Sequence, residues 1–265
     1  MNLKNEKLFK QECFINGAWV NSNDNQKIDV NNPATLDIIG TVPKCGAEET
    51  KQAIEAANSS WADWKAKPAI ERSALLRKWF NLIESNHEDL AQIMTMEQGK
   101  PIAESRGEIT YGASFVEWFA EEAKRVYGDI IPDRLTDRRI VVIKQPVGVV
   151  CAITPWNFPS SMITRKCAPA LAVGCPVVIK PASQTPYSAL ALAVLAEEAG
   201  FPKGVINIIT GSAKEIGKEM TSNAIVRKVS FTGSTEVGKI LLAQCSKTVK
   251  KVSMELGGHA PFIVF

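Results

Sequence analysis

A chain of 265 residues, 45% of them hydrophobic and 22% charged, can bury a full core and has the composition of a globular protein. Its 31 basic and 28 acidic residues leave a net charge of +3 without a long basic run, which argues against a nucleic-acid partner. The six cysteines lie far apart without CxxC spacing and only two histidines are present, which argues against a disulfide framework, a metal site or a histidine-based nucleophile relay.

Neither an export signal nor a membrane span is expected from the sequence. Residues 1–10 are charged and lack the apolar stretch of a secretory signal. The longest apolar stretch, residues 189–196, is far too short to cross a bilayer. We therefore expect a soluble, cytoplasmic protein with reduced, mostly structural thiols.

The first half of the chain predicts an N-terminal layer of short strands and helices. Residues 13–42 have the composition of short strands and turns. From residue 47 to 126 apolar side chains recur at spacings of three and four, and Pro68 and Pro101 mark helix starts, which predicts three amphipathic helices. Residues 139–144 form an isolated strand candidate, which we interpret as an arm that pairs elsewhere.

The second half alternates strand and helix. This alternation predicts right-handed crossovers and an α/β fold with a doubly wound, mostly parallel, Rossmann-like sheet. The expected strands are residues 147–153, 177–180, 205–210, 227–231 and 250–256, and the expected helices are residues 162–173, 187–199, 213–220 and 235–245.

Ligands of such sheets bind where the parallel strands end, because loop backbones and helix amino termini gather at that edge. The fourth strand ends in Phe231-Thr-Gly-Ser-Thr-Glu-Val-Gly238, where Gly233 allows close approach of a phosphate and Ser234 offers a donor. The same residues also fit a tight turn with a serine N-cap. A similar run, Gly211 to Gly217, is assigned to structure.

The second and first strands end in further polar groups. Lys180 can reach a ribose hydroxyl or a phosphate and Ser183 can donate a hydrogen bond, although a lysine that snorkels from a strand end is the alternative. After the first strand, Pro155 and Pro159 fix a loop in which the amide of Asn157 could donate to a developing oxyanion. A loop stiffener without chemistry is the alternative for that segment.

Two charged residues complete this edge. Arg165 lies one to two turns into the following helix, where it could hold a substrate carboxylate by a bidentate contact or simply be a surface arginine. Glu255 precedes two glycines at the end of the fifth strand, where it could act as a general base or be a solvated glutamate before a turn. The functional interpretation gains weight because all these residues share one edge.

The ordered set of strand-end motifs resembles the aldehyde dehydrogenase superfamily from about Phe14 to the last residue. The motifs are Pro155-Trp-Asn-Phe-Pro159, Lys180-Pro-Ala-Ser183-Gln-Thr-Pro186, Phe231-Thr-Gly-Ser-Thr-Glu-Val-Gly238 and Glu255-Leu-Gly-Gly258. Two further segments, Glu97-Gln-Gly-Lys-Pro101 and Met162-Ile-Thr-Arg-Lys166, look more narrowly like the succinate-semialdehyde dehydrogenase branch.

The resemblance implies a role for each strand-end residue. Asn157 would be the oxyanion donor, Glu255 the base that activates hydrolytic water, and Arg165 one of the arginines that hold the carboxylate of succinic semialdehyde. An NAD or NADP cofactor would contact Ile153, Trp156, Asn157, Lys180, Pro181, Ala182, Ser183, Gly233, Ser234, Gly238 and Leu256. Many NAD-selective members have glutamate at the position of Ser183, so serine there predicts that NADP is accepted.

The resemblance also implies a division of the chain. Residues 1–256 would be the NAD(P)-binding domain, residues 132–147 part of an oligomerisation arm, and residues 257–265 the start of a truncated catalytic domain whose first strand is 261–265. Family members are nearly twice as long, and none of the six cysteines lies in the family's nucleophile context. We therefore expect a homo-oligomeric parent enzyme that oxidises a small aldehyde, succinic semialdehyde to succinate, with NAD(P)+, and a fragment that is inactive alone.

Two other functions fit parts of the sequence. A non-catalytic nucleotide-binding subunit could associate with a full-length homologue through the arm near Arg139. A different hydride-transfer enzyme on the same kind of sheet would usually carry Gly-x-Gly-x-x-Gly after its first strand, and residues 147–155 lack that turn.

Overall fold

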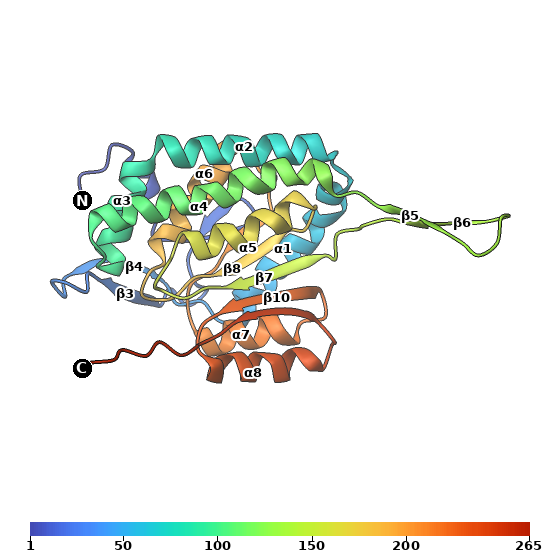
Figure 1. The fold of residues 1–265 in the computed structure, drawn as a ribbon. Coiled ribbons are helices and arrows are strands. Elements are labelled where there is room, and N and C mark those ends of the chain that lie inside the picture. Colours follow the sequence, from blue (N-terminus) through green and yellow to red (C-terminus); the bar gives the residue numbers. More distant parts are fainter.

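The computed structural model describes residues 1–265, and a seven-stranded sheet lies at its centre (Figure 1). Five strands run parallel: β7 (Val149–Ile153), β8 (Val177–Lys180), β9 (Ile206–Ile208), β10 (Val226–Thr232) and β11 (Lys251–Glu255). The strand order β11-β10-β7-β8-β9 places the first of the five in the middle, with later strands added on both sides. The predicted doubly wound, mostly parallel α/β fold is confirmed.

Two of the N-terminal strands extend this sheet instead of forming a separate layer. β1 (Cys13–Ile15) pairs antiparallel with β9 through Phe14 and Ile208, and β2 (Ala18–Val20) pairs with β1 at the edge. The tight turn between them uses Asn16 and Gly17, both at positive φ. β3 (Lys27–Asn31) and β4 (Ile38–Pro43) form their own antiparallel pair.

Helices cover both faces of the parallel strands. α5 (Ser161–Ala172) and α6 (Tyr187–Ala199) pack on one face, and α1 (Ala47–Ala66), α7 (Ala213–Ser222) and α8 (Thr235–Ser246) pack on the other. The side chains of β7 alternate accordingly, since Val150 and Ala152 belong to one hydrophobic cluster while Val149 and Cys151 belong to the second. A strand buried on both faces is apolar throughout, which is why these segments could be recognised in the sequence.

The predicted number of N-terminal helices is wrong. The segment holds four helices rather than three, because α2 (Ala69–Ser85) and α3 (His87–Gln98) are separate and α4 (Ile102–Glu122) follows. Asn86 ends one and begins the next without proline or glycine, so the sequence carries no strong breaker there. α2 and α4 stack on α5 and α6, and one cluster of 41 buried residues joins this layer to the sheet.

A two-stranded ribbon projects from the body (Figure 1). It consists of β5 (Asp129–Pro132) paired antiparallel with β6 (Arg139–Val142), and every residue of both strands is exposed. Short 3-10 turns at Glu6–Leu8 and Ala123–Arg125 complete the regular structure. The strand candidate at 139–144 therefore pairs with a neighbouring segment that the sequence interpretation had not assigned to a strand.

The last ten residues have no regular secondary structure. The strand predicted for residues 261–265 is wrong for this structure, because no neighbouring strand offers it hydrogen bonds, and the side chains of Phe262 and Phe265 are exposed. None of the helices combines the length and the apolar character that a membrane span would need.

Candidate functional site

The carboxyl ends of four parallel strands meet at one edge, with β7 and β10 at the point where the strand order reverses. Ile153 at the end of β7 pairs with Lys180 of β8 and with Phe231 of β10, while Thr232 of β10 pairs with Glu255 of β11. This register places the ends that carry the predicted residues side by side. The switch point of a doubly wound sheet is where such folds bind their ligands.

The loop after β7 is held to the sheet at its start and presents its centre to solvent. The Thr154 amide donates to the Lys180 carbonyl at 3.2 Å, so the loop leaves β7 alongside β8. Trp156, Asn157 and Phe158 are exposed. The Asn157 carbonyl accepts a hydrogen bond from Lys100 Nζ at 2.9 Å. The backbone of Asn157 is thus held by a hydrogen bond, and its exposed side chain lies in the loop that follows β7.

Lys180 is a buried cation with one hydrogen bond and no carboxylate partner. Lys180 is 4% exposed, and its ammonium donates to the Pro181 carbonyl at 2.9 Å. Burial lowers the pKa of Lys180 to about 8. The hydroxyls of Thr154 and Thr185 are also buried and have no hydrogen-bond partner in the protein. Unpartnered polar groups beside a strand end are a place where a polar ligand gains binding free energy.

The turn after β10 begins α8 with a serine cap. Ser234 is exposed and its hydroxyl accepts from the Val237 amide at 3.3 Å. A Cβ on Gly233 would lie 2.5 Å from the Phe231 ring, and a Cβ on Gly238 would lie 2.4 Å from Leu256. A side chain at Gly233 would therefore press on the Phe231 ring, and one at Gly238 would displace the Leu256 side chain. The similar turn before α7 is capped in the same way by Ser212.

Glu255 and Arg165 contact each other. A Glu255 carboxylate oxygen accepts from Arg165 Nη2 and from the Thr232 hydroxyl, both at 2.9 Å. The side chains of Arg165 and Glu255 are 31% and 45% exposed, so this ion pair is worth less than about 1 kcal/mol. Separating Arg165 from Glu255 would therefore have a small cost in free energy.

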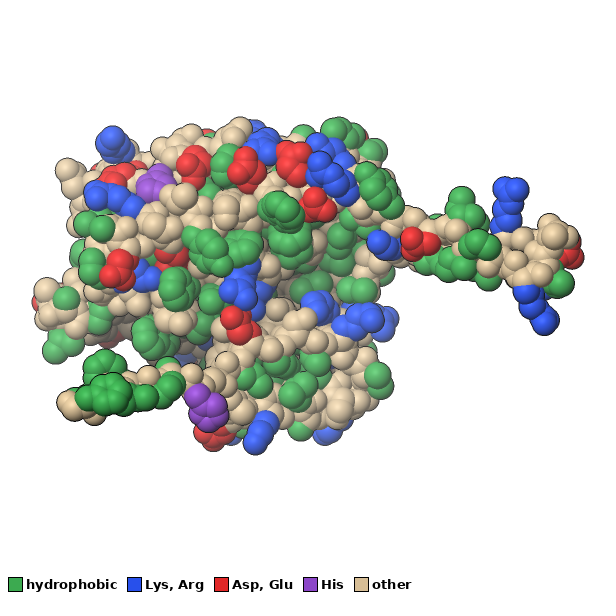
Figure 2. All heavy atoms as spheres, viewed as in Figure 1, with side chains coloured by type: hydrophobic (Ala, Val, Ile, Leu, Met, Phe, Trp, Pro, Cys, Tyr) green, Lys and Arg blue, Asp and Glu red, His purple; other side chains and the backbone are tan.

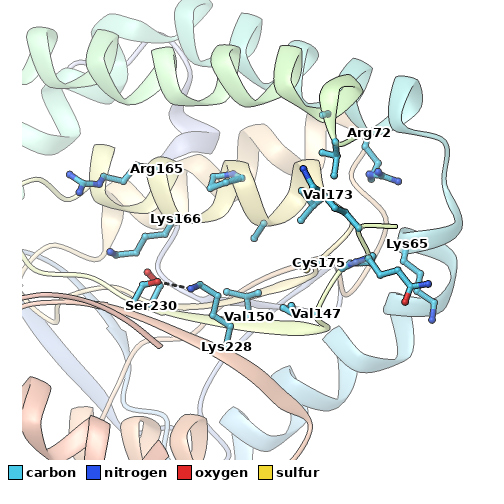
Figure 3. Close-up of a pocket in the computed structure, with 18 of the residues that line it drawn as sticks. Lys65, Arg72, Val147, Val150, Arg165, Lys166, Val173, Cys175, Lys228 and Ser230 are labelled. Atoms are coloured by element: carbon cyan, nitrogen blue, oxygen red, sulfur yellow. Dashed lines mark hydrogen bonds between the residues drawn. The ribbon is translucent and has the colours of Figure 1, made fainter. Parts of the chain in front are cut away.

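A cavity of about 820 Å³ lies between α5 and the strands β7, β10 and β11. In the space-filling view it opens below the helical layer, with basic side chains at its rim (Figure 2). Lys166 from α5 and Lys228 from β10 extend into it (Figure 3). Burial lowers the pKa of both lysines. With Arg165 they make this wall basic, and Glu255 is the acidic side chain among its lining residues.

Sequence reasoning missed Lys166 and Lys228. Lys166 follows Arg165 directly, and its ammonium donates to the Thr232 hydroxyl at 2.7 Å. Lys228 donates to the Ser253 hydroxyl at 2.6 Å. A signal was available for Lys166, which lies in the quoted segment Met162–Lys166, whereas Lys228 lies within a predicted strand, and the face that it occupies depends on the three-dimensional packing.

Comparison with known proteins identifies the family of the chain. The model of the aldehyde dehydrogenase family matches residues 19–265. The chain belongs to the aldehyde dehydrogenase family. It is 64% identical over its whole length to a glutarate-semialdehyde dehydrogenase of Pseudomonas aeruginosa and 61% identical to the succinate-semialdehyde dehydrogenase (NADP+) of Escherichia coli.

Solved structures of family members superpose closely on this aldehyde dehydrogenase chain. An E. coli NADP-dependent enzyme, 60% identical, covers 98% of the chain with a TM-score of 0.97. A betaine aldehyde dehydrogenase of Staphylococcus aureus in complex with NAD+, 35% identical, covers 97% of it with a TM-score of 0.94. The chain spans about half the length of these relatives: 55% of the two curated proteins, and 54% and 52% of the two solved chains.

Proposed function

We propose that this chain is the N-terminal, cofactor-binding part of an NAD(P)-dependent semialdehyde dehydrogenase. The observation that carries the proposal is the shared strand edge, where Lys180, the Asn157 loop, the capped turn of α8 and Glu255 lie at the switch point of the sheet. Relatives whose names state semialdehyde dehydrogenase activity match the whole of this chain.

The residues at this edge fit a dinucleotide. The buried Lys180 ammonium and the unpartnered hydroxyls of Thr154 and Thr185 supply donors with few protein acceptors. Ser234 and the amino terminus of α8 offer further donors to a phosphate. When bound, NAD(P)+ would accept the hydride that leaves the aldehyde. The protein's task is to hold the ring system and exclude competing reactions.

The remaining residues would act on the substrate. We propose that the Asn157 amide donates to the oxygen of the reacting carbonyl and that Glu255 takes a proton from the hydrolytic water. Arg165 would leave Glu255 to bind the distal carboxylate of the substrate. That carboxylate is the feature shared by glutarate and succinate semialdehydes, the substrates in the names of the two curated relatives.

We further propose that the nucleophile of the parent enzyme lies outside this chain. All six cysteines are buried. Burial raises the pKa of Cys151, Cys175 and Cys245, and raises that of Cys167 to about 12, so these thiols stay protonated. The hydrogen bond between the Cys13 and Cys45 thiols lowers the pKa of Cys13, but Cys13 is fully buried at the start of β1.

Within the parent enzyme, residues 1–256 would form the NAD(P)-binding domain and residues 257–265 would lead into the catalytic domain. The projecting β5–β6 ribbon would be an oligomerisation arm, because its exposed Ile130, Ile140 and Val141 form an apolar surface that a partner could cover. The alternative proposal is a non-catalytic subunit that joins a full-length homologue through this ribbon. Co-purification of the chain with such a homologue would favour that alternative.

NADP binding to the chain should weaken as the pH rises through about 8. The ammonium of Lys180 is charged below its pKa of about 8 and neutral above it, so its attraction for an anionic ligand is lost on the alkaline side. Isothermal titration calorimetry at pH values well below and well above 8 would measure a decrease in affinity of about tenfold, the effect of one charge-assisted hydrogen bond.

Lys180→Met provides the matched variant for this titration. We expect it to bind NADP about tenfold more weakly at low pH and to show little further change as the pH rises. Lys44→Met, at an exposed lysine whose ammonium contacts Gln26, should behave like the unmodified chain. Unmeasurable NADP binding by the unmodified chain at every pH would contradict the proposed function.

Ser183→Glu should shift cofactor preference from NADP toward NAD. Ser183 is half-buried in the loop after Lys180, and a carboxylate there would repel a 2′-phosphate while accepting hydrogen bonds from ribose hydroxyls. A loss of about tenfold in NADP affinity corresponds to about 1.4 kcal/mol of repulsion. Competition binding with both cofactors measures it, and Ser183→Ala, which adds no charge, is the control. Equal NADP affinity of the Glu and Ala variants would refute the assignment.

A further inference from the structure

The segment Glu97–Pro101, which joins α3 to α4, lies against both loops of the proposed site. Glu97 accepts from the Tyr187 and Ser188 amides at the start of α6, which follows the Lys180 loop. Gly99 ends α3 in the left-handed region at φ +85°, and the turn directs Lys100 to the loop after β7. This short connection therefore contacts both the loop after β7 and the start of α6, which follows β8.

Lys100 and Glu108 hold the loop after β7 from Asn157 to the start of α5. The side chains of Lys100 and Glu108 are 9% and 1% exposed, and their Nζ and Oε2 atoms lie 2.5 Å apart. Lys100 also donates to the Asn157 carbonyl at 2.9 Å, and its ammonium lies 4.4 Å from the centre of the Phe158 ring. This side of the loop is thus fixed at two consecutive residues.

The end of the loop is fixed by Glu108. Its Oε1 atom accepts from the Ser160 and Ser161 amides at 2.9 and 3.1 Å. The N-cap residue of α5, Ser160, makes no side-chain capping bond of its own, so a carboxylate from α4 satisfies the free amides. Arg165 lies on the same helix, one turn further along.

Stability alone does not account for this arrangement. Desolvation of a buried ion pair offsets most of its Coulombic gain, and apolar residues of similar volume are often as stabilising. The pair does, however, contact the backbone at Asn157, Ser160 and Ser161, and so restrains the path of the chain from Asn157 to Ser161. A rigid support matters for a hydrogen-bond donor, since donors contribute to catalysis when they are oriented before the reaction.

We propose that Lys100 and Glu108 are positioning residues that hold Asn157 in the orientation its amide needs to reach the substrate oxygen. This rests on the proposed role of Asn157 as a donor. Lys100 acts on the backbone of Asn157, and Glu108 acts by orienting the Lys100 ammonium and by anchoring Ser160 and Ser161.

The test follows Asn157 by nuclear magnetic resonance in the chain labelled with ¹⁵N-asparagine. The Asn157 backbone and side-chain amide signals are identified by their loss in Asn157→Asp. In Lys100→Met we expect both signals to shift and the backbone order parameter to fall from about 0.85 to below about 0.6, the range of flexible segments. Lys100→Arg, which keeps the charge and the donors, should restore the ordered signals.

Two matched variants separate positioning from general stability. Lys67→Met removes the exposed ion pair with Glu71 and should leave the Asn157 signals in place. Glu108→Gln keeps one oxygen for the Ser160 and Ser161 amides but loses the ion pair, so it should shift the Asn157 signals even if Lys100→Met does not fold. Unchanged Asn157 signals in a folded Lys100→Met, or in Glu108→Gln, would overturn the proposal. NADP affinity measured on the same samples reports on the proposed function separately.

Discussion

Given NADP and succinic semialdehyde, the purified chain is expected to bind the dinucleotide and to produce no NADPH. Aldehyde oxidation with NAD(P)+ in this family proceeds through a cysteine thiolate, and the cysteines of this chain are buried. Cys167 is close in sequence to Arg165, yet it lies on the buried face of α5 within the hydrophobic core, and burial raises its pKa to about 12. Removing the nucleophile of an enzyme lowers turnover by about 10⁶-fold, which puts NADPH formation below detection.

The measurement is NADPH absorbance over time, with the E. coli succinate-semialdehyde dehydrogenase as the positive control. Calorimetry on the same preparation must detect NADP binding, because an unfolded chain would also be inactive. NADPH formation that persists through purification and disappears in Cys167→Ser would show that the chain has its own nucleophile. The proposal that the nucleophile lies elsewhere would then be wrong.

The parallel strands were predictable because each is an apolar run bounded by turn residues. Val177–Lys180, for example, is entirely buried and is followed by proline. Pairings that join distant segments were not predictable: β1 is three residues long, and its position at the edge of β9 depends on a contact between Phe14 and Ile208. The division of the second predicted helix at Asn86 was equally hidden, since asparagine is compatible with a helix interior as well as with a cap.

The candidate site was predicted from the rule that parallel strands bind ligands at their carboxyl ends. The prediction was incomplete because this rule finds residues at strand ends only. Residues at strand ends could be grouped because parallel strands end at one edge, and Lys180 and Glu255 were found in this way. Lys100 and Glu108 lie on the helical layer and reach the loop only through packing. The ion pair of Arg165 with Glu255 joins residues 90 positions apart, a contact that no local pattern encodes.

Glu97→Ala should destabilise the chain by about 3 kcal/mol, because two buried donors each lose their acceptor at a cost of about 1–3 kcal/mol. Glu97 is 2% exposed and accepts from the Tyr187 and Ser188 amides at 2.6 and 2.8 Å, and Pro186 offers α6 no side-chain cap. Urea unfolding followed by circular dichroism measures the loss. Glu55→Ala, at an exposed position in α1, should stay within about 0.5 kcal/mol of the unmodified chain.

Glu97→Gln separates the hydrogen bonds from the charge. Its single acceptor oxygen can satisfy one of the two amides, so we expect about half the loss seen with alanine. Burial raises the pKa of Glu97 to about 8, above its ordinary 4.5, so the folded state favours the protonated form. Its contribution to the free energy of unfolding is therefore full below about pH 4.5 and declines as the pH rises toward 8. The Gln variant should lack this decline. An equal dependence of the free energy of unfolding on pH in both proteins would mean that another group titrates. An alanine variant as stable as the unmodified chain would mean that water replaces the carboxylate at the start of α6.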